Sequence, residues 1–169
     1  KKNNSDVFYH NVYLKKEKKN FYSKYINQKN SFKDLLLNGN KIIFSSSCVK
    51  KKFLIKKNIK FNENKKFVSV EDYDFWLKVA KSKGYFFLIN RILGAYNLNV
   101  MSISRNRINH YLNTLSLLNS YKKFLVSDII NFKLRKIYIL ISFIKISIYE
   151  KNFEFLFFIF SYLIGFRKK

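Results

Sequence analysis

The sequence predicts an α/β fold, because segments with strand-like patterns alternate with segments of helical pattern along the first two thirds of the chain. Hydrophobic residues make up 48% of the 169 residues and aromatic residues 19%, which supports a packed core and excludes a disordered polycation despite the net charge of +24. After residue 108, long apolar runs are interrupted only by single charges. We therefore expect an α/β unit over residues 1–107 and a helical, basic and apolar tail over residues 108–169.

The chain is expected to begin with a strand, a loop and a short helix. Residues 6–14 are rich in β-branched and aromatic side chains, which is typical of a strand, and the polar residues 15–30 follow as a loop. Ser31 and Asp34 have the spacing of a helix-capping pair ahead of three leucines, and Asn38-Gly39 provides a stop signal.

The middle of the chain continues the alternation. Residues 41–49 predict a second strand, with Cys48 as a small buried side chain, and residues 50–58 predict a short basic helix or turn. A helix is then expected between Ser69, as its N-cap, and Gly84, as its end. Its apolar positions recur at helical spacing: Phe75, Trp76, Val79 and Ala80. Two further extended segments follow, over residues 85–89 and 91–98.

The start of the helix after Ser69 holds the densest acidic cluster of a basic chain. Three of the ten acidic residues, Glu71, Asp72 and Asp74, fall within four positions. Two interpretations are open: the carboxylates complement the positive end of the helix dipole, or one of them lies at the edge of a pocket and accepts a proton. Surrounding lysines are expected to keep the pKa of such a carboxyl low. Spacing alone does not decide between the two.

The charge composition bears on the class of partner. Of the 34 basic residues only five are arginine, and the lysines are scattered, so we do not expect nucleic-acid binding. An anionic membrane surface suits bulk lysine charge better, because it requires no geometric match. The single cysteine suits a reducing compartment. The sequence shows no leading apolar stretch, so we expect no signal peptide. His10 and His110 are far apart without companion ligands, so we assign no metal to them.

Four segments resemble family 2 glycosyltransferases with the GT-A fold. Residues 71–80 (EDYDFWLKVA), followed by Gly84, resemble the family's E-D-x-D-x-W-L-x-x-A segment, and residues 93–104 (LGAYNLNVMSIS) are similar to its L-x-x-Y-R-x-H-x-x-S-x-S segment. Residues 43–54 resemble the strand and helix before the acidic motif, and residues 5–10 the strand that follows the metal-binding D-x-D. The four segments occur in the family's order.

The resemblance implies a partial GT-A domain, the acceptor-side half, with the nucleotide-binding half and its D-x-D lying before Lys1. It makes Asp72 the catalytic base of an inverting transfer from a nucleotide-sugar to a glycan or lipid-linked acceptor, with Glu71 and Asp74 in support. A divalent cation, Mg²⁺ or Mn²⁺, would be bound mainly outside this chain. The activity implied is synthesis of a cell-surface polysaccharide or glycolipid, and this stretch alone is not expected to turn over a nucleotide-sugar.

Further residues on the acceptor or diphosphate side follow from the same resemblance: Ser46, Ser47, Trp76, Asn97, Asn99, Ser102 and Ser104. Asn97 and Asn99 stand where the family often has Arg and His, so leaving-group stabilisation is the part that departs from the pattern. Each candidate has a simpler interpretation. A single Trp on an amphipathic helix is more often core than a sugar platform, and serines are common in strands and loops.

The tail from 120 to 169 carries ten Lys or Arg residues against three acidic ones. Its longest uncharged run, residues 155–166, has 12 residues, whereas a spanning helix needs roughly 20. Two interpretations are open: helices that pack on the α/β unit, or attachment to an anionic leaflet through Phe, Ile and Lys. The resemblance implies a cytoplasmic enzyme peripheral to the inner face of the membrane. The alternative function is a non-catalytic basic module that binds anionic membranes or polyanions.

Overall fold

The computed structural model describes residues 4–97, 107–124, 126–149 and 151. This part of the chain folds into a four-stranded sheet and five α-helices, which confirms the mixed α/β class. The strands are β1 (Val7–Leu14), β2 (Lys19–Phe21), β3 (Ser47–Val49) and β4 (Phe86–Tyr96). The helices are α1 (Ser31–Asn38), α2 (Lys51–Lys57), α3 (Glu71–Lys81), α4 (Arg107–Tyr121) and α5 (Ile129–Tyr149).

Strand β1 is the centre of the sheet. It pairs in parallel with β4 along its whole length, from Val7 opposite Phe86 to Leu14 opposite Tyr96. On its other edge, β3 pairs antiparallel with its first half and β2 with its last residues. The β1–β4 register shifts on both sides of the buried residue Asn11. Its Oδ1 accepts the N–H of Ser23, and its Nδ2 donates to Oδ1 of Asn90.

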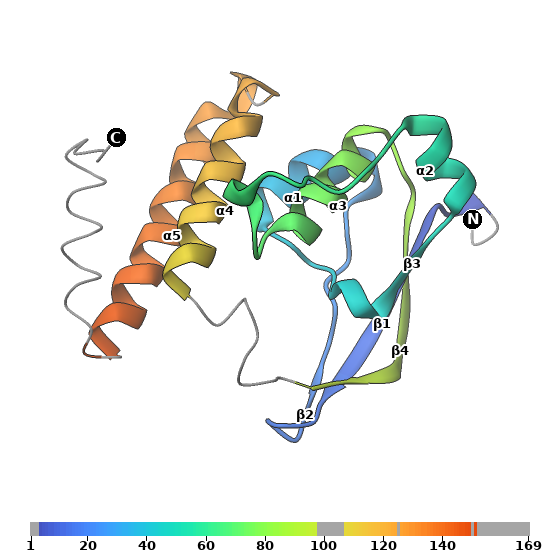
Figure 1. The fold of residues 1–169 in the computed structure, drawn as a ribbon, viewed down its shortest axis with the longest axis horizontal. Helices are drawn as coiled ribbons and strands as arrows, with labels where there is room; N and C mark the ends of the chain where they lie inside the picture. The colour runs from blue at the N-terminus through green and yellow to red at the C-terminus, as the bar shows by residue number, and fades with distance from the viewer. Residues whose placement is uncertain (1–3, 98–106, 125, 150, 152–169) are drawn as a thin grey trace.

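Four of the helices, α1, α3, α4 and α5, lie on one side of the sheet in two layers (Figure 1). Helices α1 and α3 lie between the sheet and the pair α4–α5, and α2 lies at the opposite end of the molecule. The core fills the space between the sheet and α3, with Val7, Tyr9 and Phe86 from the sheet and Trp76 and Leu77 from α3 all buried. These strand residues alternate with half-exposed neighbours, as expected for a sheet with one covered face.

The tail is helical where the structure describes it, in α4 and α5. Among the described residues, no helix combines the length and hydropathy needed to cross a bilayer. The apolar run of residues 155–166 lies outside the described residues.

Three predicted elements differ from the structure. Of residues 41–49 only the last three form a strand, because the Ser46 and Ser47 hydroxyls bond back to the carbonyls of Ile43 and Phe44 and favour a 3₁₀ turn at Phe44–Ser46. The predicted loop 15–30 contains the exposed strand β2. The two extended segments after residue 84 are one strand, β4, bent at its register shifts. Cys48 is exposed rather than buried.

Both predicted serine caps are wrong. Helix α1 begins at Ser31, so that Asn30 takes the N-cap position, and the carboxylate of Asp34 instead forms an ion pair with Lys41 at 2.6 Å. At α3 the N-cap is Val70, because Ser69 has a left-handed backbone with φ of 71° and its side chain points to another element. A capping bond requires an extended residue directly before the first turn, and neither serine is in that position.

Helix α3 ends with a left-handed turn in which Lys83, not the glycine, has positive φ, at 61°. The N–H of Gly84 donates to the carbonyl of Val79 at 3.0 Å. A Cβ atom on Gly84 would lie 2.6 Å from Val79 Cγ1 and 3.0 Å from the Phe53 ring. Gly84 is therefore needed because the chain passes close to α3 there.

We predict that Gly84→Ala lowers the free energy of unfolding by about 1–3 kcal/mol, since the added methyl overlaps packed side chains. Lys83→Gly is the matched control at the neighbouring position and has the opposite sign, because glycine relieves a left-handed conformation that costs other residues about 1–2 kcal/mol. Urea unfolding of the three chains measures both changes. Equal stabilities for wild type and Gly84→Ala would contradict the close approach.

Candidate functional site

The acidic motif begins α3, and Asp72 lies in the first turn of the helix with its side chain half-buried. Its Oδ1 accepts a hydrogen bond from the backbone N–H of Tyr73 at 2.6 Å, and its Oδ2 accepts one from Nδ2 of Asn40 at 3.2 Å. Asn40 belongs to the loop that follows α1, so the carboxylate is held by groups from two elements. Each oxygen retains room for a further hydrogen bond.

The Asn40 side chain is oriented by its own loop. Its Oδ1 accepts the N–H of Ile42 at 3.1 Å, which leaves the amide NH₂ to face Asp72. The preceding Gly39 has φ of 88°, so the chain turns sharply at the end of α1. The hydroxyl of Tyr73 donates to the carbonyl of Leu35 at 2.6 Å and ties α3 to α1. This bond fixes the distance between Asp72 and the Asn40 loop.

Burial raises the pKa of the Asp72 carboxyl above its usual range. The adjacent charge of Glu71 raises this pKa further, while the Tyr73 N–H, His110 and Asn40 oppose the shift without reversing it. The expectation of a lowered pKa is therefore wrong. The causes that shift this pKa are burial, Glu71, Tyr73, His110 and Asn40, and no lysine is among them.

Two further side chains border the first turn of α3. The Oε2 atom of Glu71 is buried and has no hydrogen-bond partner among the described residues. His110, from α4, places its Nδ1 3.1 Å from the carbonyl oxygen of Ser69 and 3.4 Å from the Ser69 hydroxyl. The site therefore joins the start of α3, the Asn40 loop and α4. Sequence reasoning gave no role to Asn40 or His110, since they lie 32 and 38 positions from Asp72 and form no local motif.

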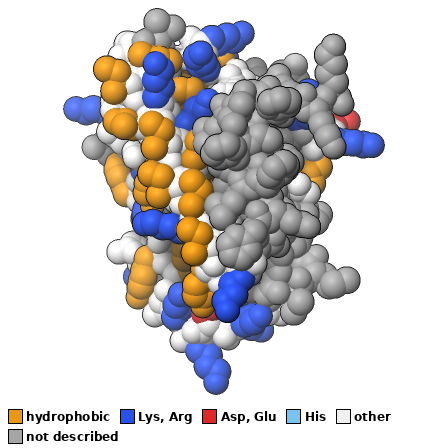
Figure 2. Space-filling model, turned by 90° about the vertical axis from the view of Figure 1, so that its left-hand side faces the viewer, with side chains coloured by type: hydrophobic (Ala, Val, Ile, Leu, Met, Phe, Trp, Pro, Cys, Tyr) orange, Lys and Arg blue, Asp and Glu red, His pale blue; other side chains and the backbone are white. Residues whose placement is uncertain are grey.

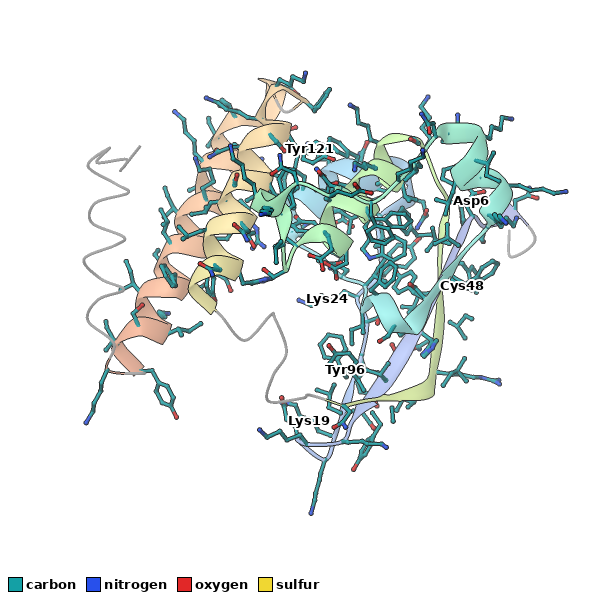
Figure 3. The ribbon with its side chains drawn as sticks, viewed as in Figure 1. Asp6, Lys19, Lys24, Cys48, Tyr96 and Tyr121 are labelled. Carbon is teal, nitrogen blue, oxygen red and sulfur yellow. The ribbon has the colours of Figure 1, made fainter. Side chains whose placement is uncertain are left out.

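Asp74 has a structural role, separate from Asp72. It is 2% exposed, accepts a hydrogen bond from the Tyr121 hydroxyl at 2.9 Å and pairs with the Lys78 ammonium at 2.7 Å. Burial and the neighbouring Asp74 charge raise the pKa of Tyr121, so its hydroxyl remains a donor. Tyr121 lies among the helices, away from the sheet (Figure 3). Asp74 thus links α3 to the end of α4.

Trp76 is part of the core. It is fully buried and its ring lies 5.6 Å from Phe44, 5.0 Å from Phe75 and 6.3 Å from Phe86, measured between centroids. The core interpretation of this residue is confirmed, and neither ring face is open to a sugar.

Of the remaining predicted site residues, three are described, and none of their hydrogen bonds reaches Asp72. Ser46 is buried and Ser47 half-buried, and both hydroxyls are bonded to their own turn. Asn97 is exposed just after β4. The other three lie outside the described residues: Asn99, Ser102 and Ser104.

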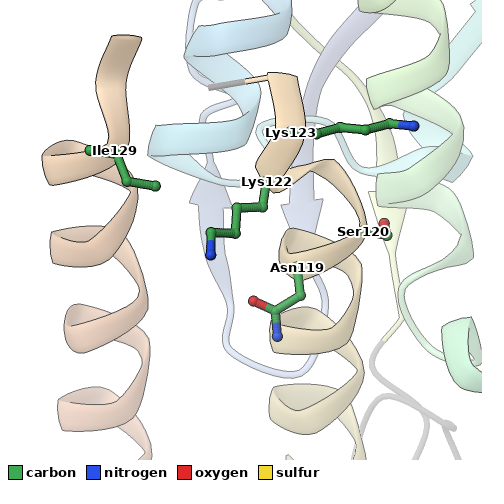
Figure 4. A pocket seen from close by; sticks show the side chains of 5 residues that line it. All are labelled: Asn119, Ser120, Lys122, Lys123 and Ile129. Atoms are coloured by element: carbon green, nitrogen blue, oxygen red, sulfur yellow. The ribbon is translucent and has the colours of Figure 1, made fainter. Parts of the chain in front are cut away.

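Two hollows of the described surface lie elsewhere. One, of about 570 Å³, is bordered by Asn119, Lys122 and Ile129 between the end of α4 and the start of α5, and Lys122 and Lys123 point to opposite sides of the chain there (Figure 4). The other, of about 630 Å³, lies between the start of α1 and the end of α3. Asp72 borders neither hollow, so both are separate from the acidic motif.

The described residues were also tested for a divalent cation site. No group of three or more His, Cys, Asp or Glu side chains in the described ranges is arranged to hold a metal ion. Of the three carboxylates in the first turn of α3, Asp74 is paired with Lys78 and bonded by Tyr121, and Asp72 Oδ2 is bonded to Asn40. The resemblance implies that the ligands of its cation lie mainly outside this chain, so the cation stays an expectation and no step below depends on it.

A scan against protein-family models and searches of curated proteins and of solved structures found no match to this chain.

We predict that Tyr121→Phe lowers the free energy of unfolding by about 1–3 kcal/mol, because it leaves a buried carboxylate oxygen of Asp74 without its donor. Tyr149→Phe is the matched control, since Tyr149 is 87% exposed, and should leave stability unchanged. Thermal and urea unfolding measure both. Equal losses in free energy of unfolding for the two variants would show that the hydrogen bond from Tyr121 to Asp74 does not stabilise the fold.

Replacement of Asp72 by Asn is predicted to raise stability at pH 7. A carboxyl whose pKa is higher in the folded state binds its proton more tightly there than in the unfolded state. The free energy of unfolding therefore falls as pH rises above about 4, the ordinary pKa of Asp. Asn has no proton to lose, so the variant does not lose this stability at pH 7. Its advantage over the wild type in free energy of unfolding should vanish below about pH 4. The helix-dipole interpretation predicts the reverse, a loss of about 0.3–1 kcal/mol at pH 7. Unfolding measured across pH, with the exposed Glu63→Gln as control, separates the two.

Proposed function

We propose that this chain is the acceptor-side part of an inverting glycosyltransferase with a GT-A fold, and that Asp72 is its catalytic base. The observation that carries the proposal is the state of the Asp72 carboxyl. It is half-buried, its pKa is raised, and the Asn40 amide orients one of its oxygens at the start of α3. A carboxyl whose role was only to complement a helix dipole would gain nothing from burial beside Glu71.

The raised pKa suits a general base. A carboxylate with a higher pKa takes a proton more readily, and general-base catalysis contributes about 10²–10⁴-fold to rate. In the proposed step, the acceptor hydroxyl gives its proton to Asp72 while its oxygen attacks the anomeric carbon of a nucleotide-sugar. The bond to the diphosphate breaks, and the electron pair leaves with the nucleoside diphosphate. Attack from the face opposite the leaving group inverts the anomeric configuration.

The surroundings of Asp72 assign supporting roles. Asn40 orients the carboxylate and still leaves lone pairs for the hydroxyl proton. The adjacent charge of Glu71 raises the basicity of Asp72. Asp74 holds α3 against α4 and stays out of the chemistry. We place the nucleotide-binding half and the cation ligands before Lys1, as the resemblance implies.

We further propose that the enzyme works at the cytoplasmic face of the membrane, as a peripheral protein, on a glycan or lipid-linked acceptor of cell-surface polysaccharide or glycolipid synthesis. The net charge of +24 supports attachment to an anionic surface. The competing function is a non-catalytic basic module that binds membranes or polyanions. That alternative shares the attachment and needs no proton acceptor at Asp72.

In the longest native chain that contains this sequence, Asp72→Asn should reduce transfer by about 100-fold or more while the protein stays folded. Asp72→Glu should retain part of the activity, because it keeps the carboxylate. The matched control is Glu63→Gln, which removes an exposed carboxylate from the loop before α3 and should leave turnover unchanged. Release of nucleoside diphosphate from a panel of nucleotide-sugars measures the effect.

Full turnover by a folded Asp72→Asn protein would remove Asp72 from the role of base. Absence of turnover in the unmodified native chain with every donor tested, together with vesicle binding, would favour the non-catalytic module.

A further inference from the structure

Helix α5 is apolar on two opposite faces. One face packs on α4 and α1, where Phe132, Ile139 and Phe143 are buried. The other face carries large apolar side chains that are about half exposed or more: Ile130 71%, Leu134 57%, Ile137 50%, Ile141 46% and Ile148 59%. We call these five residues the outer stripe. Figure 2 shows rows of hydrophobic side chains along this side of the molecule with basic side chains, Lys or Arg, at their margins.

The spacing makes the outer stripe continuous. Its members follow one another at intervals of four, three, four and seven residues, so at about 100° per residue all lie within about 60° of one another on the helix. A contiguous apolar row of this length on a surface helix marks an interaction site. A helix that is apolar on both faces is expected to be covered on both.

The charges on α5 indicate what covers it. Lys133 and Lys145 are exposed and lie on the two margins of the outer stripe, about 60° to either side of its middle. Tyr138 and Tyr149, 64% and 87% exposed, lie on the Lys145 side. The sequence of α5 contains no Asp or Glu. Apolar side chains flanked by lysines and tyrosines are the arrangement of helices that lie in a membrane interface.

We propose that the outer stripe of α5 lies on the surface of an anionic lipid bilayer, with the helix axis parallel to the membrane. This inference rests on the membrane attachment proposed above and is independent of Asp72. Lipid is favoured over a second copy of this chain, because two chains of +24 repel each other while an anionic leaflet attracts both lysine margins. The apolar side chains enter the acyl boundary, and Lys133 and Lys145 reach the headgroups.

The test uses the full 169-residue chain and co-sedimentation with two kinds of vesicle. One is phosphatidylcholine alone, and the other contains about 30% phosphatidylglycerol as the anionic lipid. The stripe variant is Ile137→Asn with Ile141→Asn. The control variant is Ile55→Asn with Leu93→Asn, because these side chains are 68% and 57% exposed on α2 and β4, away from α5. Thermal unfolding of each variant is recorded in parallel.

We expect the stripe variant to lose about tenfold or more of its partition onto the anionic vesicles, with the control variant unchanged, since only the outer stripe inserts. Lys133→Glu with Lys145→Glu should reduce binding to anionic vesicles and leave the weak binding to phosphatidylcholine as it is. The hydrophobic and charge variants thus test the two halves of the interaction separately.

Equal partition of the stripe variant and the wild type would overturn the inference while leaving membrane attachment in place. A fall in unfolding temperature of the stripe variant without a change in partition would also overturn it, and would assign the stripe to packing against the chain's own residues 152–166. Concentration-dependent dimers that the stripe variant abolishes would assign it to a second copy. Failure of the wild type to bind anionic vesicles would also overturn the proposed membrane attachment. It would not bear on the role of Asp72 as a base, which the transfer assay tests separately.

Discussion

The enclosure of helix α3 is the constraint on which the rest of the structure depends. Five consecutive residues, from Tyr73 to Leu77, are buried, and five residues cover more than one full turn, so the helix is surrounded on all sides. Such a helix is held in place by the sheet, by α1 and by α4 at once. Its first turn is the part where carboxylates remain accessible at the end of a rigid support. A proton acceptor placed there has a fixed position relative to the acceptor it would serve.

A buried helix that carries an acidic motif must satisfy each carboxylate separately. Asp74 is neutralised by Lys78 and bonded by Tyr121, because an unpaired charge at that depth would be strongly destabilising. Asp72 is only half-buried and receives weaker compensation, from Asn40 and a backbone N–H, so its pKa rises. Two carboxylates two positions apart therefore differ in role. Depth in the core separates them, and the sequence motif alone does not.

The sequence predicted the elements that have strong local signals and missed those set by distant contacts. The strand β1 follows from its β-branched and aromatic composition, and α1 from its leucines with Asn38-Gly39 as a stop. Helix α3 follows from its apolar periodicity, and the helical tail from its long apolar runs. The serine caps failed because Ser69 takes a left-handed backbone beside His110, a contact 41 positions away. The acidic cluster was recognisable as a candidate site, but the sign of the pKa shift was not, because burial of Asp72 depends on α1, α3 and α4 packing together. Asn40 carries no motif at all.

The exposed Cys48 on β3 makes the chain suited to single-site chemistry. It is the one cysteine of the sequence, and it lies at the end of the molecule opposite to α5 (Figure 3). A thiol-reactive dye or spin label would therefore report from a position remote from the outer stripe, with the native sequence unaltered. The same exposed thiol makes the protein sensitive to air, since oxidation would join two chains through a disulfide between their Cys48 residues.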